Sequence, residues 1–258
     1  MNNGVDRRKM ERLGETNTNK YGSKMTIVEY NHARDIVVEF ESGNKVRTEY
    51  KHFKNKSVKS VYDKSVYSIG YIGEGYYKIR ENGIVTRRYE TWKGMLERCY
   101  DSKLHMKFPL YIGCTVVEEW HNFQNFAKWY DDNYYGIEGH QMNLDKDILV
   151  KGNKIYSPNT CVFVPKFINN LFTNRKNGRG TYPVGVSFNL ASGKYVAQCN
   201  STNGTRTGLG YFHTADEAFD AYKIYKEKTV REIADIYKNI IPVNLYNAMK
   251  SYTVDVND

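Results

Sequence analysis

The spacing of apolar residues changes along this chain, and the change limits the folds it can adopt. Between residues 25 and 53, short runs such as MTIVEY, DIVVEF and VRTEY alternate apolar and polar residues, as half-buried strands do. The ESGN segment predicts a hairpin turn between the last two runs. Residues 87–100 instead repeat apolar side chains at every third or fourth position, which predicts an amphipathic helix. Because strand-like and helix-like spacings occupy separate segments of the chain, the sequence indicates the α+β class.

The middle of the chain combines aromatic helices with a ββα pattern. Residues 118–132 carry Trp, Phe and Tyr at helical spacing, and residues 62–85, which are rich in Tyr and Gly, predict further short strands. Residues 141–172 predict two strands that are separated by a turn at Gly152 and followed by a short helix from Lys166. This order of elements is a ββα unit.

The C-terminal third predicts a sheet backed by a helix. Residues 182–213 contain three β-like runs joined by the turns ASG and STNG. Thr214 and Glu217 have the spacing of a capping box, so a helix is expected from there to about Tyr237. Alternation in KYVAQCN places Ala197 toward this helix, and its small side chain allows close packing.

Five segments are therefore expected. They are a mobile basic tail (1–23), a small β-module (24–62), a ββα core with flanking amphipathic helices (63–174), a basic linker (175–181) and a C-terminal sheet packed on a helix (182–258). In the β-module, Tyr50 and Phe53 among lysines would suit phosphate binding or base stacking. The alternative is an ordinary SH3-like barrel with a solvated basic edge.

The charge distribution favours a polyanionic partner. The 258 residues hold 38 Lys and Arg against 29 Asp and Glu, a net charge of +9, and cations that contact phosphate release counterions. Residues 45–64 and 166–180 are basic, whereas residues 115–147 carry seven acids against two lysines. The acidic part could be a metal or catalytic centre between phosphate-binding segments, or these could be solvated surfaces of mixed charge.

Membrane and secreted classes are not expected. No run approaches the ~18 apolar residues of a membrane helix, and residues 1–20 are polar. We therefore expect an intracellular protein with no membrane partner. The cysteines are far apart in sequence, which predicts reduced, buried thiols at Cys99, Cys114, Cys161 and Cys199.

The C-terminal segment resembles the AP2/ERF family of DNA-binding domains. The resemblance lies in GVSFNLASGKYVAQC, LGYF and TADEAFDAY, and it covers about residues 180 to 237. It implies a three-stranded antiparallel sheet that lies in the major groove of double-stranded DNA. Where the family usually has Arg and Trp on the sheet, this chain has Ser187 and Tyr195.

Alternation along these strands selects the candidate base-reading side chains, which are Ser187, Asn189, Lys194, Gln198, Asn200 and Arg206. Asn and Gln can bond bidentately to adenine and Arg to guanine, while Lys194 could hold a phosphate. Further phosphate contacts are expected from Lys59, Arg175, Lys176 and Arg179. The alternative is a solvated sheet face without a ligand.

The ββα segment resembles HNH endonucleases, and phage-encoded proteins join such a segment to an AP2/ERF domain. The resemblance implies a metal ligand at Asp145, a second at Asn169 and a loop-bracing residue at Thr160. The catalytic histidine of that family is replaced by Lys146, which on a partly exposed strand is protonated and cannot accept a proton from water.

Two routes to activity remain open. Asp145 and Asp147, on the same face of a strand, could share Mg²⁺ or Mn²⁺ with Asn169, or His121 or His140 could act as the base.

These patterns predict a phage-type DNA-binding protein in the host cytoplasm, with a degenerate nuclease centre. The alternatives are an active endonuclease that uses Asp145 and Asp147, and a virus-encoded protein that inhibits a host factor. The oligomeric state is left open.

Overall fold

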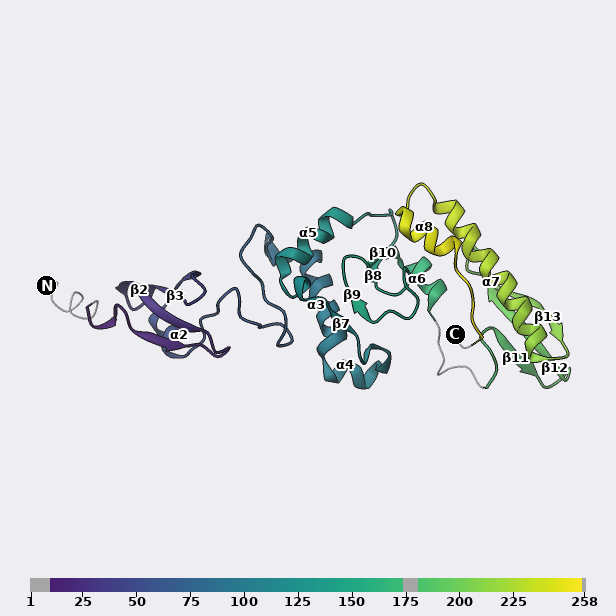
Figure 1. The fold of residues 1–258 in the computed structure, drawn as a ribbon, viewed down its shortest axis with the longest axis horizontal. Coiled ribbons are helices and arrows are strands. Elements are labelled where there is room, and N and C mark those ends of the chain that lie inside the picture. Colours follow the sequence, from purple (N-terminus) through teal and green to yellow (C-terminus); the bar gives the residue numbers. More distant parts are fainter. Residues whose placement is uncertain (1–9, 174–180, 257–258) are drawn as a thin grey trace. The chain divides into compact units, whose positions relative to one another are not determined.

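The chain forms two units, each with helices and strands, so the predicted α+β class is confirmed. The computed structural model describes residues 10–173 and 181–256 (Figure 1). Unit 1 contains the chain to Asp132 together with Lys154–Ser157, and unit 2 contains Asn133–Asn153 and Pro158–Asp258. None of the helices in the described ranges is long and apolar enough to cross a bilayer. All four cysteines are buried thiols, as expected.

Unit 1 begins with a four-stranded antiparallel sheet in chain order. Its strands are β1 (Thr16–Thr18), β2 (Lys24–His32), β3 (Asp35–Phe40) and β4 (Lys45–Thr48), and helix α2 (Tyr50–Lys54) follows. Alternate residues of β2 and β3 and Phe53 of α2 form a buried apolar core. The prediction of a mobile tail over residues 1–23 is wrong for Thr16–Thr18, because β1 pairs with β2.

A buried polar network attaches residues 58–63 to this sheet. Asp63 is 3% exposed, and its carboxylate accepts hydrogen bonds from the side chains of Asn19 (2.7 Å) and Ser23 (2.6 Å) and from the Ser60 amide (2.8 Å). Asn19 also donates to the Val58 carbonyl at 3.1 Å. A buried network with partners for its polar groups rigidifies the segments it joins.

The remainder of unit 1 is built around aromatic helices. They are α3 (Arg87–Tyr100), α4 (Ser102–Lys107) and α5 (Phe123–Asn133), with 3-10 turns η1 (Pro109–Tyr111) and η2 (Glu118–His121). Two-residue strands β7 (Thr115–Val116) and β9 (Ile155–Tyr156) pair in parallel. Trp92 packs on Phe123 and donates its indole N–H to the Trp120 carbonyl at 2.7 Å. The two predicted aromatic helices are thus confirmed as α3 and α5.

Residues 62–85 form less strand than predicted. Only β5 (Arg80–Glu81) and β6 (Ile84–Val85) pair as a hairpin. The rest is held by other contacts: the Gln124 side chain donates to the carbonyls of Ile72 (3.2 Å) and Tyr77 (3.0 Å). At Gly70 an added Cβ would overlap the Trp92 ring, so this glycine permits a close approach of the backbone to α3.

Unit 2 places two small sheets along one long helix. Strands β8 (Met142–Asp145) and β10 (Val162–Pro165) pair antiparallel and lead into α6 (Lys166–Phe172). The second sheet contains β11 (Val186–Asn189), β12 (Lys194–Asn200) and β13 (Arg206–Phe212). Helices α7 (Ala215–Tyr237) and α8 (Val243–Lys250) complete the unit (Figure 1).

Helix α7 contributes to two apolar cores. Ala218 and Tyr222, near its beginning, pack beneath the three-stranded sheet. Val230 and Ile233, further along, join the core of β10, α6 and α8. The predicted capping box of Thr214 and Glu217 is present. The segments predicted separately as a ββα core and a C-terminal domain thus share this helix, within one compact unit.

Candidate functional site

The pairing of the three-stranded sheet places all six predicted base-reading residues on one face. Ser187 pairs with Val196, which also pairs with Tyr211, and Asn189 pairs with Lys194. Beyond a bulge, Gln198 pairs with Gly208 and Asn200 with Arg206. Paired residues, and alternate residues of one strand, point to the same side of a sheet. The surface formed by Ser187, Asn189, Lys194, Val196, Gln198, Asn200, Arg206 and Tyr211 is called the outer face below.

The opposite face of the sheet is covered by α7. Ala197 is 0% and Cys199 6% exposed, and both pack with Ala218 and Tyr222. At Gly185, which has a φ of +79°, an added Cβ would overlap the Tyr222 ring. The helix therefore lies close against the sheet, as the small Ala197 predicted, and the polar side chains are left on the outer face.

Most side chains of the outer face have no partner within the described residues. Ser187, Asn200, Arg206 and Tyr211 are exposed, and Lys194 and Gln198 are half-buried. No described hydrogen bond or ion pair involves the side chain of Lys194, Gln198, Asn200 or Arg206. Asn189 differs, because its side chain accepts from the amides of Ala191 (3.0 Å) and Ser192 (3.1 Å) in the hairpin turn. Asn189 therefore has a structural role in this turn.

Two features of the outer face were not among the predicted site residues. Tyr211 is 60% exposed and lies beside Val196. Gly208, opposite Gln198, has no heavy atom within 4 Å of an added Cβ, so the surface beside Gln198 is open. The hairpin turn alone would not have found Tyr211, because counting from the Asn200–Arg206 pair sets Gly210 opposite Val196, and the bulge brings Tyr211 there instead.

The sequence around the outer face contains no acidic residue. From Ile148 to Ala215 there is no Asp or Glu, and the cations in this stretch include Lys194 and Arg206 of the sheet. An uninterrupted cationic stretch attracts phosphate groups. The predicted contacts Arg175, Lys176 and Arg179 belong to the same stretch, but they lie outside the residues that the structure describes.

The second predicted site, after β8, has a different character. Asp145 is the last residue of β8, so Asp147 is not on the strand and the expectation of a shared strand face is wrong. One carboxylate oxygen of Asp145 accepts from the amides of Asp147 and Ile148, both at 2.8 Å. The pKa of Asp145 is raised to about 6, chiefly by burial and also by the negative charge of Asp147.

Lys146 is buried, which corrects the expectation of a partly exposed lysine. It is 6% exposed, and its Nζ lies 3.2 Å from a carboxylate oxygen of Asp147. The loop is closed by Asn153, whose side chain donates to the Lys146 carbonyl at 2.7 Å. This bond braces the loop between β8 and β10, although Thr160 was the expected position of the brace.

No described hydrogen bond links the remaining predicted members of a nuclease centre to Asp145. Within the described residues no hydrogen bond joins Asn169 of α6 to Asp145 or Asp147. The His140 ring stacks near Phe167 at 4.8 Å between centroids, and the length of β8, about 10 Å, separates it from Asp145. His121 belongs to unit 1, where its ring bonds the Val116 carbonyl at 3.1 Å. In this arrangement Lys146 supplies the positive charge beside Asp147, and the described residues hold no group of three His, Cys, Asp or Glu that could bind a metal.

The aromatic residues expected to bind nucleic acid in the β-module are internal. Phe53 is fully buried. Tyr50 is covered by the Arg12 guanidinium, 3.9 Å from its ring, and donates its hydroxyl to Glu15 at 2.9 Å. Lys59, by contrast, is exposed, and its Nζ lies 5.2 Å from the centroid of the Tyr21 ring.

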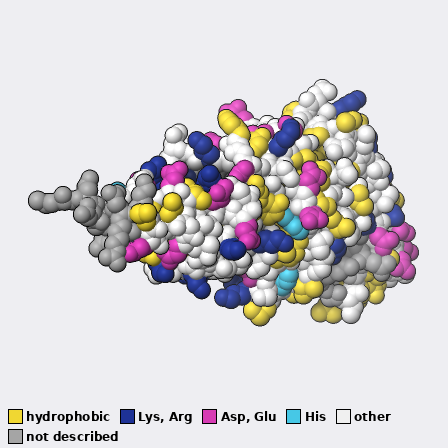
Figure 2. Space-filling model, turned by 60° about the vertical axis from the view of Figure 1, so that its left-hand side comes forward, with side chains coloured by type: hydrophobic (Ala, Val, Ile, Leu, Met, Phe, Trp, Pro, Cys, Tyr) yellow, Lys and Arg dark blue, Asp and Glu magenta, His cyan; other side chains and the backbone are white. Residues whose placement is uncertain are grey.

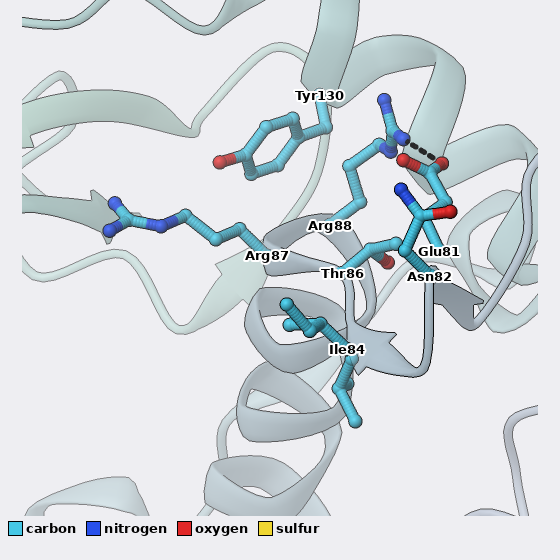
Figure 3. Close-up of a pocket in the computed structure, with 8 residues that line it drawn as sticks. Glu81, Asn82, Ile84, Thr86, Arg87, Arg88 and Tyr130 are labelled. Atoms are coloured by element: carbon cyan, nitrogen blue, oxygen red, sulfur yellow. Dashed lines mark hydrogen bonds and ion pairs between the residues drawn. The ribbon is translucent and has the colours of Figure 1, made fainter.

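A pocket of about 420 Å³ lies at the start of α3 (Figure 3). Arg88 lines it and donates to Glu81 (2.7 Å) and to Asp131 (2.9 Å), so two carboxylates balance its charge. Arg87 extends away from Arg88 in Figure 3. The bonds of Arg88 join the β5–β6 hairpin to the helices, and none of the predicted site residues lines this pocket.

Comparison with protein-family models, with curated proteins and with solved structures finds no match to this chain.

Proposed function

We propose that this protein binds double-stranded DNA and recognises a site with the outer face of its C-terminal sheet. The observation that carries the proposal is the register, which gathers Gln198, Asn200 and Arg206 on one face, where the described residues give their side chains no partner. Solvent-accessible amide and guanidinium groups held on a well-packed sheet are suited to a polar ligand. The resemblance to AP2/ERF domains supports the same conclusion.

The residue types match the chemistry of the major groove. Gln198 and Asn200 can each bond bidentately to adenine, and Arg206 can bond to guanine. Lys194 supplies a phosphate contact, which positions the complex without selecting sequence. Tyr211 offers an apolar ring for the thymine methyl group. With two amides and one guanidinium, the face favours sites that are rich in A·T pairs.

In this proposal the ββα segment is an HNH-like nuclease scaffold of phage type that has lost its activity. The protein acts in the host cytoplasm. The supporting observation is that Lys146 stands in place of the catalytic base and pairs with Asp147, while Asp145 bonds to the backbone of its own turn. The alternative is an endonuclease that uses Asp145 and Asp147 with Mg²⁺ or Mn²⁺.

One experiment separates these functions. The full chain is incubated with a randomised duplex library, with and without Mg²⁺ or Mn²⁺, and the bound DNA is sequenced and run on a denaturing gel. We expect enriched sites with intact strands. Metal-dependent breaks that disappear in Asp145→Ala would establish the endonuclease, whereas a protein that enriches no sequence does not read DNA.

A further inference from the structure

The lysines between residues 20 and 59 differ in whether a carboxylate balances them. Lys24 (3.5 Å), Lys45 (3.8 Å), Lys51 (3.0 Å) and Lys54 (3.0 Å) each lie near the carboxylate of a glutamate. Within the described residues, Lys20, Lys56 and Lys59 have no such partner. Figure 2, which brings the N-terminal side forward, shows Lys and Arg interspersed with acidic side chains. Unbalanced lysines are therefore a better guide to an anion site than the total number.

These three lysines come from two segments that lie against each other. The Lys20 amide donates to the Lys56 carbonyl at 3.0 Å. Lys59 lies over the ring of Tyr21, which is 44% exposed. Lys20, Tyr21, Lys56 and Lys59 form one surface, called the lysine–tyrosine patch below.

The buried network around Asp63 holds both segments of the patch. Asn19 accepts from the Tyr21 amide at 2.9 Å and donates to the Val58 carbonyl at 3.1 Å. Asp63 binds Asn19 and also the Ser60 amide, next to Lys59. Lys56 itself has a φ of +58°, a left-handed conformation that costs a non-glycine residue about 1 kcal/mol or more. The backbone of the patch is therefore preorganised, so ligand binding has to order only the lysine side chains.

Three unbalanced ammonium groups beside an exposed aromatic ring match the phosphodiester backbone of DNA. Lysine binds phosphate as a point charge and carries no sequence information. We infer that the lysine–tyrosine patch is a second DNA contact, which binds the backbone of any duplex. The choice of DNA as the polyanion rests on the proposed function.

The test compares two triple variants of the full chain that lose the same charge. One is Lys20→Gln with Lys56→Gln and Lys59→Gln. The other changes Lys93, Lys103 and Lys107, exposed lysines of α3 and α4, to Gln. Affinity for a duplex of arbitrary sequence is measured from low to high salt, and circular dichroism verifies the fold. A Lys20→Gln, Lys59→Gln double variant avoids any effect at the left-handed Lys56.

Each lost phosphate contact lowers the slope of log affinity against log salt by about 0.9. The magnitude of this slope should therefore be smaller by about 2 to 3 in the patch variant than in the wild type. At 0.1 M salt the patch variant should bind the duplex at least about tenfold more weakly. The double variant should lose about 2, and the control should change little. Equal slopes for patch variant and control would overturn the inference.

The outcome for the patch is distinguishable from the outcome for the sheet. A protein that binds duplexes through the patch but enriches no site keeps the inference and loses the proposed recognition by the outer face. If the protein enriches a site, but the slope of log affinity against log salt is the same in the patch variant as in the wild type, the proposed recognition stands and the inference is lost. Absence of any duplex binding overturns both.

Discussion

The outer face of the C-terminal sheet and the turn after β8 both carry polar side chains in unit 2, but they use them differently. On the outer face, Gln198 and Asn200 have no described side-chain partner. After β8, Asp145 bonds two backbone amides and Lys146 pairs with Asp147. Polar groups that are bonded within the fold stabilise a turn, whereas solvent-accessible polar groups on a rigid sheet are available to a ligand. Under the proposed function, the outer face is the recognition surface and the turn after β8 has a structural role.

The strongest test of the comparison removes both amides of the outer face. Gln198→Ala with Asn200→Ala should weaken binding to the selected site by about 3 kcal/mol, because each bidentate contact contributes about 1–3 kcal/mol. Binding to unrelated duplex should change little. Asn247→Ala, an exposed amide of α8, is the matched control. If the double variant keeps its preference for the selected site, the outer face does not read sequence.

The turn after β8 should respond in stability instead. Because the pKa of Asp145 is raised to about 6 in the folded state and is about 4 when unfolded, only the folded carboxyl still holds a proton between these values. Its contribution to stability is therefore present below about pH 4 and is lost as the pH rises through about 6. Asp145→Asn removes this charge and keeps the oxygen acceptor, so it should stabilise the protein at pH 7 by about 2 kcal/mol.

Urea unfolding at several pH values measures this effect. The difference between Asp145→Asn and wild type should grow from pH 4 to 6 and then level off. Asp147→Asn, which leaves the buried Asp145 in place, should have a smaller effect. If the plots of unfolding free energy against pH are parallel for Asp145→Asn and wild type, the ionised form of Asp145 does not destabilise the folded state.

Tyr211 sharpens the comparison within the sheet itself. Tyr211→Ala should lower DNA affinity by about 1–2 kcal/mol and leave the melting temperature unchanged, since the ring is 60% exposed. Tyr195→Ala, on the α7 side, should lower the melting temperature, because its ring packs 5.0 Å from Phe188. A melting temperature that falls equally in both variants contradicts the assignment of Tyr211 to the outer face.

Lys194 should produce the smallest effect. Lys194→Gln is expected to weaken binding to the selected and to the unrelated duplex by the same few-fold factor, because Lys194 contacts phosphate alone. It should also lower the slope of log affinity against log salt by about 1. Titrations of both duplexes at several salt concentrations measure this. A loss confined to the selected site would show that Lys194 contacts a base.

Elements with local signals could be predicted from the sequence. Helix α7 and its capping box follow from Thr214, Glu217 and the apolar stripe, and the outer face follows from alternation in β12. Helix α8 was missed because it is short and begins after Pro242 without a side-chain cap. The strands expected in residues 62–85 are mostly absent from the described structure because tertiary contacts of Gln124 and Gly70 hold that backbone.

The candidate sites divide in the same way. The face of the sheet on which Gln198 and Arg206 lie depends on the alternation of side chains along a strand, which can be read from the sequence. The burial of Lys146 and the bond from Asn153 depend on how a loop closes over neighbouring residues. No period or spacing encodes that closure, so the exposure of Lys146 was predicted incorrectly.

The sharing of α7 has a consequence for folding. Its 23 residues extend about 35 Å, and its two parts belong to different apolar cores. Neither core can lose α7 without exposing apolar surface, so the three-stranded sheet and the β8–β10 segment should melt in one cooperative transition. A fragment that ends before α7 would lack both cores, and the smallest autonomous folding piece of unit 2 therefore contains both sheets.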